Sequence, residues 1–123
     1  MKIAPKNLVA LAYVADVKAS IAFYELLGFE TGNTHVDPAT GETDWAALER
    51  GHAALMLGKA GDPVVAAQQS VLFYLYYDDI AATHEAMLRL GLPCGEMSYP
   101  FYCPKGEFRL VDPDGYVLML THT

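Results

Sequence analysis

The sequence predicts an α+β fold built from two consecutive βαβββ modules. Three observations predict it: the chain repeats itself at an offset of 63 residues without a gap, each half holds short apolar runs and one helical pattern, and turn residues separate these segments. At 123 residues, with 53% hydrophobic and 19% charged side chains, the chain is long enough to bury a continuous core.

The repeat keeps one register from end to end. The identities are Tyr13 with Tyr76, Asp16 with Asp79, Ala19 with Ala82, Leu27-Gly28 with Leu90-Gly91, Gly32 with Gly95 and Leu55-Met56-Leu57 with Leu118-Met119-Leu120. The same offset gives conservative matches, which include Trp45 with Phe108, Leu48 with Val111 and Glu49 with Asp112. We therefore expect one domain over 1–123 made of two repeats, about 1–60 and 70–123, with a linker at 59–69.

The first half has the pattern of a strand, a helix and three further strands. Residues 8–14 are a continuous apolar run of strand length, and Asp16 follows as a helix N-cap. Apolar residues then recur at helical spacing from Val17 to Leu27, and Gly28 ends the helix. Strands are expected at about 29–36, 45–50 and 53–58.

The second half repeats this order. A strand is expected at 71–77, and Asp79 caps a helix whose apolar face carries Ile80, His84, Met87 and Leu88. Strands are then expected at about 94–99, 106–112 and 116–121. The face of each sheet that its helix does not cover needs a cover, so we expect the two sheets to form a paired-sheet cup with the helices outside, which is a natural ligand site.

Charge and composition exclude several classes of partner. The net charge of −7 argues against nucleic acid and against anionic lipid, whereas it permits a cationic ligand. The sequence has no apolar run of about 20 residues and no secretory leader pattern, so we expect a cytoplasmic protein. Cys94 and Cys103 do not form a CxxC pair and are expected to be reduced thiols.

Two segments resemble a known family. Val14-Ala15-Asp16 with Ser20-Ile21-Ala22-Phe23-Tyr24 and Leu27-Gly28-Phe29 is similar to the opening of the glyoxalase, bleomycin resistance protein and dioxygenase superfamily, also called the vicinal oxygen chelate superfamily. Glu107-Phe108-Arg109-Leu110-Val111-Asp112-Pro113-Asp114-Gly115-Tyr116 resembles its closing signature. The resemblance covers nearly the whole chain and implies the same paired-sheet cup.

Metal-dependent members of that family hold one divalent ion, usually through histidines and glutamates on the first and last strand of each module. The resemblance places these positions at Val9, Met56, Leu72 and Met119, which are all apolar. A hard divalent ion prefers oxygen or imidazole nitrogen, and thioethers do not replace carboxylates. We therefore expect no metal and no cofactor. The four histidines fall on different elements with no common spacing.

Strand alternation predicts what lines the cup. If Val9 and Leu72 face it, Tyr13, Tyr74 and Tyr76 face it as well, whereas Phe73, Leu75 and Tyr77 face the helices. Aromatic faces and methionine suit a planar ligand that is partly apolar. The predicted ligand-binding residues are Tyr13, Trp45, Met56, Leu72, Tyr74, Tyr76, Tyr99, Phe101, Tyr102, Arg109 and Met119. No catalytic residue is assigned.

The resemblance implies a metal-free, homodimeric protein similar to antibiotic (bleomycin-like) resistance proteins, which sequester an aromatic and in some cases cationic ligand without chemistry. Two alternatives stay open. One is an enzyme of the family (a lyase, isomerase or oxygenase) with catalytic groups among Tyr74, Tyr76, Glu107 and Arg109. The other is a regulatory or housekeeping module that uses the fold for partner contact. Metal analysis and a thermal-shift screen would separate the three.

Overall fold

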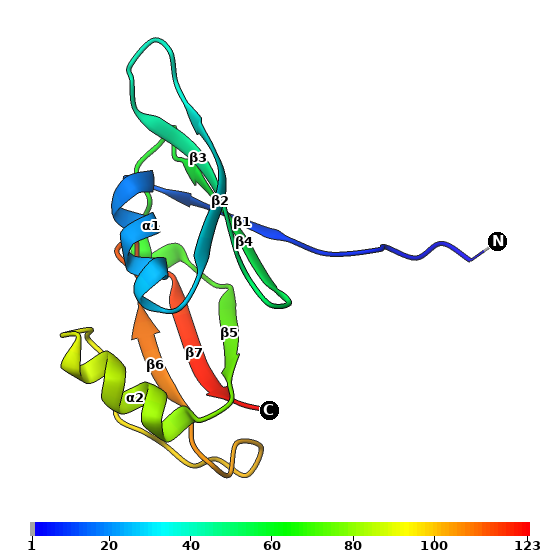
Figure 1. Ribbon diagram of the computed structural model, residues 1–123, viewed down its shortest axis with the longest axis vertical. Helices are drawn as coiled ribbons and strands as arrows, with labels where there is room; N and C mark the ends of the chain where they lie inside the picture. Colours follow the sequence, from blue (N-terminus) through cyan, green and yellow to red (C-terminus); the bar gives the residue numbers. More distant parts are fainter. Residues whose placement is uncertain (1) are drawn as a thin grey trace. The chain divides into compact units, whose positions relative to one another are not determined.

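The computed structural model describes residues 2–123, and the chain divides into two compact units. Unit 1 ends at Val64 and unit 2 runs from Val65 to Thr123. Each unit has one α-helix and one mixed sheet, so the predicted α+β class is confirmed (Figure 1). None of the helices within residues 2–123 is long and apolar enough to cross a membrane.

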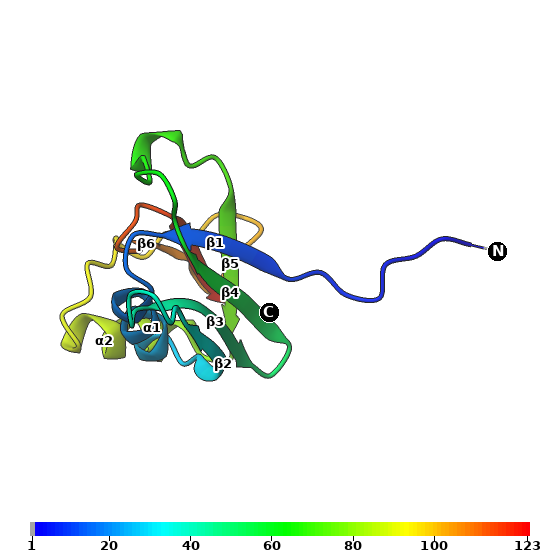
Figure 2. The same ribbon diagram turned by 90° about the horizontal axis from the view of Figure 1, so that it is seen from above.

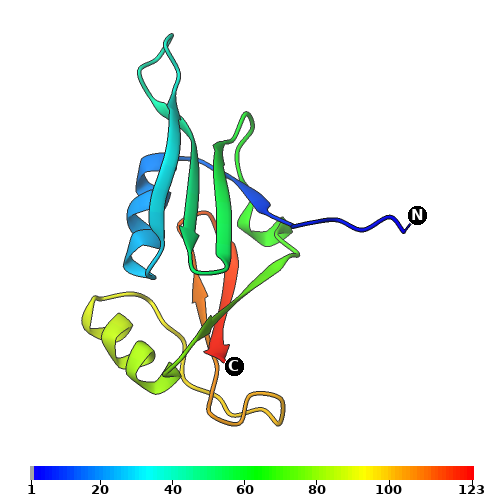
Figure 3. The ribbon, with the colours of Figure 1, turned by 45° about the vertical axis from the view of Figure 1, so that its right-hand side comes forward.

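Unit 1 is a four-stranded sheet covered by one helix. Its strands lie in the order β1-β4-β3-β2, with β1 parallel to β4 and the other neighbours antiparallel (Figure 3). Residues 2–9 lead away from this sheet as an extended segment (Figures 1 and 2). The elements are β1 (Ala10–Val14), α1 (Val17–Leu26), β2 (Glu30–Val36), β3 (Thr43–Arg50) and β4 (Ala53–Lys59).

Helix α1 begins and packs as the sequence predicts. The Asp16 carboxylate accepts a hydrogen bond from the backbone N–H of Ala19 at 3.1 Å, which satisfies a donor that the first helical turn leaves free. Val17, Tyr24 and Leu27 are buried on the side of the helix that faces the sheet. The sheet contributes buried side chains from three strands, among them Val14, Ala46, Leu48, Leu55 and Leu57.

Unit 2 has a smaller sheet in the order β5-β7-β6, with β5 parallel to β7 and β6 antiparallel to it (Figure 3). Asp79 caps its helix by accepting from the N–H of Ala82 at 3.0 Å. Ile80 and Met87 are buried, but Leu88 is exposed, so its place on the predicted apolar face is wrong. The elements are η1 (Ala66–Gln68), β5 (Leu72–Tyr77), α2 (Ile80–Arg89), β6 (Phe108–Val111) and β7 (Val117–His122).

The strand predicted near residues 94–99 does not form. The N–H of Gly95 donates to the carbonyl of Arg109 at 2.7 Å, and the N–H of Ser98 donates to that of Glu107 at 2.8 Å. The step from Gly95 to Ser98 is three residues, whereas the step between their partners, Arg109 and Glu107, is two. This mismatch breaks the regular ladder of hydrogen bonds. What remains is one isolated bridge between Ser98 and Glu107, so the sheet of unit 2 has three strands instead of four.

The repeat holds for most of its length and then shifts by one residue. The two helices are related by 63 residues, and so are the pairs Leu11–Met56 and Tyr74–Met119 in the parallel ladders. In the antiparallel ladders, however, Ala46 pairs with Leu57 whereas Phe108 pairs with Leu120, so β6 is displaced by one position.

The cause of this shift is the length of one hairpin. The β3–β4 hairpin closes with Arg50 opposite Ala53 and so encloses two residues. In unit 2 the N–H of Asp112 donates to the carbonyl of Tyr116 at 3.0 Å, which leaves three residues in the turn. The ungapped pairings of Trp45 with Phe108, Leu48 with Val111 and Glu49 with Asp112 are therefore wrong by one position.

Candidate functional site

Each sheet has a second face, opposite its helix, that carries exposed or half-buried side chains; we call it the open face of that unit. Residues that lie directly opposite each other on neighbouring strands point their side chains to the same face of the sheet. The open face of unit 1 consists of Leu11, Tyr13, Trp45, Ala47, Met56 and Gly58. The open face of unit 2 includes Leu72, Tyr74, Tyr76, Arg109, Val111, Val117, Met119 and the buried Thr121, which pairs with Tyr76.

The open face of unit 1 has two aromatic residues toward one end of its strands. Tyr13 and Trp45 lie on either side of Gly58, because each of them is paired with that glycine in its own ladder. A Cβ added at Gly58 would lie 3.5 Å from the Tyr13 ring and 3.4 Å from Leu11, which is ordinary van der Waals contact, so both side chains pack closely over this glycine. Tyr13 is 60% exposed.

The open face of unit 2 is richer in tyrosine. The rings of Tyr74 and Tyr76 stack with centroids 6.4 Å apart and an interplanar angle of 28°. Met119 lies between Tyr74 and Arg109 in the paired strands. The alternation predicted for β5 is present: Leu72, Tyr74 and Tyr76 are exposed, whereas Phe73, Leu75 and Tyr77 are half-buried on the helix side. Burial raises the pKa of the Tyr77 phenol to about 12.

Three further aromatic residues named from the sequence lie in the segment before β6. Tyr99, Phe101 and Tyr102 are exposed, and the last two rings meet edge to face at 5.3 Å. Backbone and side-chain hydrogen bonds hold this segment: the N–H of Cys103 donates to the carbonyl of Pro100 at 2.9 Å, and the N–H of Lys105 donates to His122 Nε2 at 3.0 Å.

The segment ends in a turn that only glycine fits. Gly106 has φ +116°, and a Cβ there would lie 2.9 Å from Met97 Cγ. Its carbonyl accepts a hydrogen bond from the buried hydroxyl of Thr121 at 2.9 Å. This turn fixes the start of the chain stretch that carries Glu107 into β6.

Glu107 is the acidic residue next to the open face of unit 2. It lies two residues before Arg109 and therefore on the same side of the chain, yet it is buried. The Tyr102 hydroxyl donates to its Oε1 at 3.4 Å. The Glu107 carboxylate is the main cause of a raised Tyr102 pKa, with burial second; for Tyr74, burial raises the pKa first and the charge of Glu107 adds to it.

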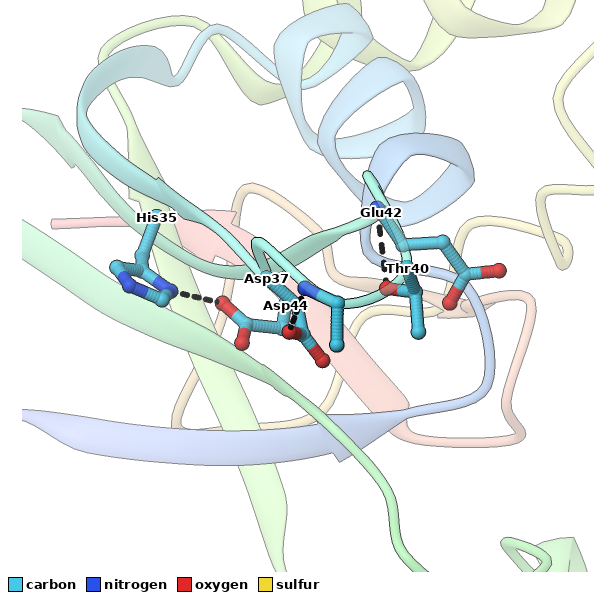
Figure 4. Close-up of polar contacts among 6 residues, drawn as sticks. His35, Asp37, Thr40, Glu42 and Asp44 are labelled. Atoms are coloured by element: carbon cyan, nitrogen blue, oxygen red, sulfur yellow. Dashed lines mark hydrogen bonds and ion pairs between the residues drawn. The ribbon is translucent and has the colours of Figure 1, made fainter.

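The histidines do not converge on a common site. His35 Nδ1 lies 2.6 Å from Asp44 Oδ1, next to a turn closed by local hydrogen bonds of Asp37 and Thr40 (Figure 4). His84 Nε2 lies 2.9 Å from the carbonyl of Gly95, and its ring packs on Phe108 at 4.5 Å. Each of these imidazoles is thus tied to its own local partner.

The residues present do not fit the divalent metal centre that some members of the fold use. The four positions that the resemblance points to, Val9, Leu72, Met56 and Met119, offer two hydrocarbon and two thioether side chains, which are poor ligands for a hard ion. Nor do three or more His, Cys, Asp or Glu side chains gather as a metal-binding group anywhere in residues 2–123. Both cysteines are free thiols.

Comparison with known proteins identifies the family. The family model described as "Glyoxalase/Bleomycin resistance protein/Dioxygenase superfamily" matches residues 7–120. The search of curated proteins returned no match. Similar solved structures include a bleomycin-binding protein complexed with bleomycin, at 21% sequence identity and a TM-score of 0.74, covering 97% of this chain and 99% of that one.

Two further structures share the fold at similar distance. One is a bleomycin resistance determinant encoded on the transposon Tn5, with 21% identity, a TM-score of 0.75 and coverage of 97% of this chain and 98% of that one. The other is TnmS3, an antibiotic binding protein from Streptomyces sp. CB03234, with 20% identity, a TM-score of 0.75 and coverage of 98% of both chains. Because the family model spans nearly the whole sequence, this protein belongs to the glyoxalase/bleomycin resistance protein/dioxygenase superfamily.

Proposed function

We propose that this protein binds a small organic molecule on its open faces and sequesters it without changing it chemically. The observation that supports this most is the run of exposed aromatic side chains on β5, Tyr74 and Tyr76, beside Met119. A sheet face that served only to pack a core would bury such rings, whereas a face that recognises a ligand presents them.

The chemistry of these faces favours a planar, partly apolar ligand that can carry positive charge. Tyrosine rings stack on planar groups and attract cations at about 0.5–2 kcal/mol per contact. Methionine adapts its shape to irregular partners. Unit 2 carries seven Asp and Glu against three Lys and Arg, so its net charge of −4 also attracts cations.

Antibiotics of the bleomycin kind are the first ligands to test, because two of the similar structures are a bleomycin-binding protein and a bleomycin resistance determinant. In this proposal the contacts come from the residues predicted from the sequence: Tyr13, Trp45, Met56, Leu72, Tyr74, Tyr76, Tyr99, Phe101, Tyr102, Arg109 and Met119. Binding rests on stacking, methionine contacts and charge, and uses no Lewis acid.

The proposal is tested by following backbone amide signals in NMR while metal-free bleomycin and other cationic aromatic antibiotics are added. We expect at least one compound to shift the signals of the open-face residues in a saturable way, and the compound to be recovered with unchanged mass. A compound that is converted would instead favour the enzyme alternative. No shift with any compound would remove the proposal.

We further propose that the chain forms a homodimer in the cytoplasm, as the sequence resemblance implies. Sedimentation at micromolar concentration tests the assembly: a dimer supports this part of the proposal, and a pure monomer rejects it. This test uses no ligand, so its outcome is read separately from that of the NMR titration.

A further inference from the structure

We propose that Glu107 is an anchoring site for an N–H-bearing organic cation, such as a protonated amine, an amidinium or a guanidinium group, attached to an aromatic ligand on the open face of unit 2. This inference rests on the proposed function, because it assigns a specific partner at that face. It also narrows the ligand class from cations in general to cations that donate hydrogen bonds.

One carboxylate oxygen of Glu107 is a buried acceptor without a donor in the part of the chain that the structure describes. Glu107 is only 5% exposed, and within residues 2–123 its Oε2 atom has no hydrogen-bond partner. Buried polar atoms are nearly always paired in folded proteins, and a buried carboxylate oxygen without a donor is unfavourable. A ligand that donates to Oε2 would supply the missing partner.

The side-chain hydrogen bond that Glu107 accepts from Tyr102 is long and therefore weak. The Tyr102 hydroxyl lies 3.4 Å from Oε1, whereas a hydroxyl bound firmly to a carboxylate lies at about 2.5–2.7 Å. Tyr102 is 58% exposed and comes from the irregular segment before β6. Its side chain can therefore be displaced or can close over a bound cation at little cost.

Two of the protein's own donors near Glu107 are not bonded to it. The Thr121 hydroxyl, on the strand next to Glu107, donates to the carbonyl of Gly106. Arg109 lies two residues along on the same face, but no ion pair joins it to Glu107 in the part of the chain that the structure describes. The Oε2 atom is thus left for an external donor.

The surroundings favour an aromatic cation over a simple amine. Phe108 pairs with Leu120, so Glu107 lies opposite Thr121, whose partner on β5 is Tyr76. The Tyr76 ring stacks on that of Tyr74, so the carboxylate and the two rings lie near one another on the same face. A ligand with a cationic N–H group at one end and a flat ring at the other would reach the carboxylate and stack on Tyr74 and Tyr76 together.

The test compares three small probes of similar size: benzamidine, which is a cation with N–H donors; benzyltrimethylammonium, which is a cation without them; and benzamide, which is neutral. Affinities are measured by NMR titration of wild type, Glu107→Gln and Glu96→Gln. Glu96 is an exposed carboxylate in the same unit and serves as the matched control.

We expect wild type and E96Q to bind benzamidine about tenfold or more tightly than either other probe, and E107Q to lose that preference, in keeping with the strength of hydrogen bonds to charged groups. Because E107Q replaces a buried carboxylate whose Oε2 has no hydrogen-bond partner among the described residues, the variant should also melt at a temperature higher by about 3 °C or more. Weaker binding in a more stable protein is a combination that a purely structural residue would not give.

A second measurement does not depend on a variant that folds. The carboxyl ¹³C signal of Glu107 in wild type should move on addition of benzamidine and stay in place with benzyltrimethylammonium. The inference is overturned if benzamidine does not bind, or if E107Q retains the preference. Should bleomycin still shift the open-face signals in that case, the proposed function stands and only the assignment of Glu107 falls.

Discussion

Thr121→Val tests how much the hydrogen bond from the Thr121 hydroxyl to the Gly106 carbonyl stabilises the segment that leads into β6. Thr121 is 1% exposed, and its hydroxyl donates to the buried carbonyl of Gly106 at 2.9 Å. Valine has nearly the same shape and keeps the packing. The substitution therefore removes one donor and leaves a buried carbonyl without that partner.

The magnitude follows from the lost donor. A buried acceptor left unsatisfied costs about 1–3 kcal/mol, and a domain of this size loses roughly 4 °C of melting temperature per kcal/mol. We expect Thr121→Val to lower the free energy of unfolding by about 2 kcal/mol and the melting temperature by roughly 4–12 °C.

Chemical denaturation with urea gives the free energy, and circular dichroism gives the melting temperature. Thr34→Val is the matched control, because Thr34 is exposed on β2 and should change stability by less than about 0.5 kcal/mol. If Thr121→Val were as stable as wild type, the hydroxyl would not hold the Gly106 turn, and the positioning of Glu107 described above would lose its support.

Three further predictions address the turns, the alkaline limit and the ligand face. Gly115→Ala should cost roughly 2–4 kcal/mol in the free energy of unfolding, because φ there is +90° and the new Cβ would lie 2.8 Å from the Cα of Ala66. Gly61→Ala, which meets open space, should be nearly neutral in the same denaturation assay. The folded-state pKa of Tyr77, about 12, lies above the ordinary value of 10. The contribution of the neutral phenol to the free energy of unfolding is therefore full below pH 10 and is lost as the pH rises toward 12. Tyr77→Phe should therefore flatten the decline in stability between pH 10 and 12, and an equal decline in both proteins would refute this. Tyr74→Ala should weaken binding of a ligand found in the antibiotic screen by about 5–50-fold through lost stacking, while Leu88→Ala, an exposed change on α2, should not; calorimetry of both variants decides.

The sequence predicted the elements that depend on local signals. The aspartate caps and the apolar spacing determine where α1 and α2 begin, and both helices start directly after the predicted caps, Asp16 and Asp79. Side-chain alternation on β5 followed from period-2 geometry and from the choice of Leu72 as an open-face residue. These are short-range properties that a single sequence carries directly.

What failed depended on pairing across strands. An ungapped repeat could not reveal that one hairpin encloses two residues and the other three, since turn residues occur at both places and do not give the length of the loop. The absent strand near 94–99 has a similar origin, because its spacing against β6 is uneven and only Gly95 and Ser98 find partners. Hydrogen-bond register depends on two strands together, so the sequence of one strand alone does not determine it.

Glu107 illustrates the same limit at the candidate site. From the sequence it was named only as one of several groups for an enzyme alternative, on the strand expected at 106–112. The shifted hairpin places it on the open-face side of β6, where Tyr102 and its neighbours bury it. Burial of an acidic residue arises from tertiary packing, so no local sequence motif predicts it.

The most direct test of the central claim, that this family member recognises a small molecule through its own side chains, is calorimetric titration of protein that has been treated with EDTA and dialysed. The account predicts saturable binding of metal-free bleomycin or a related cationic antibiotic, with the drug recovered unaltered. Binding that disappears after EDTA treatment and returns only with a stoichiometric divalent ion would contradict it.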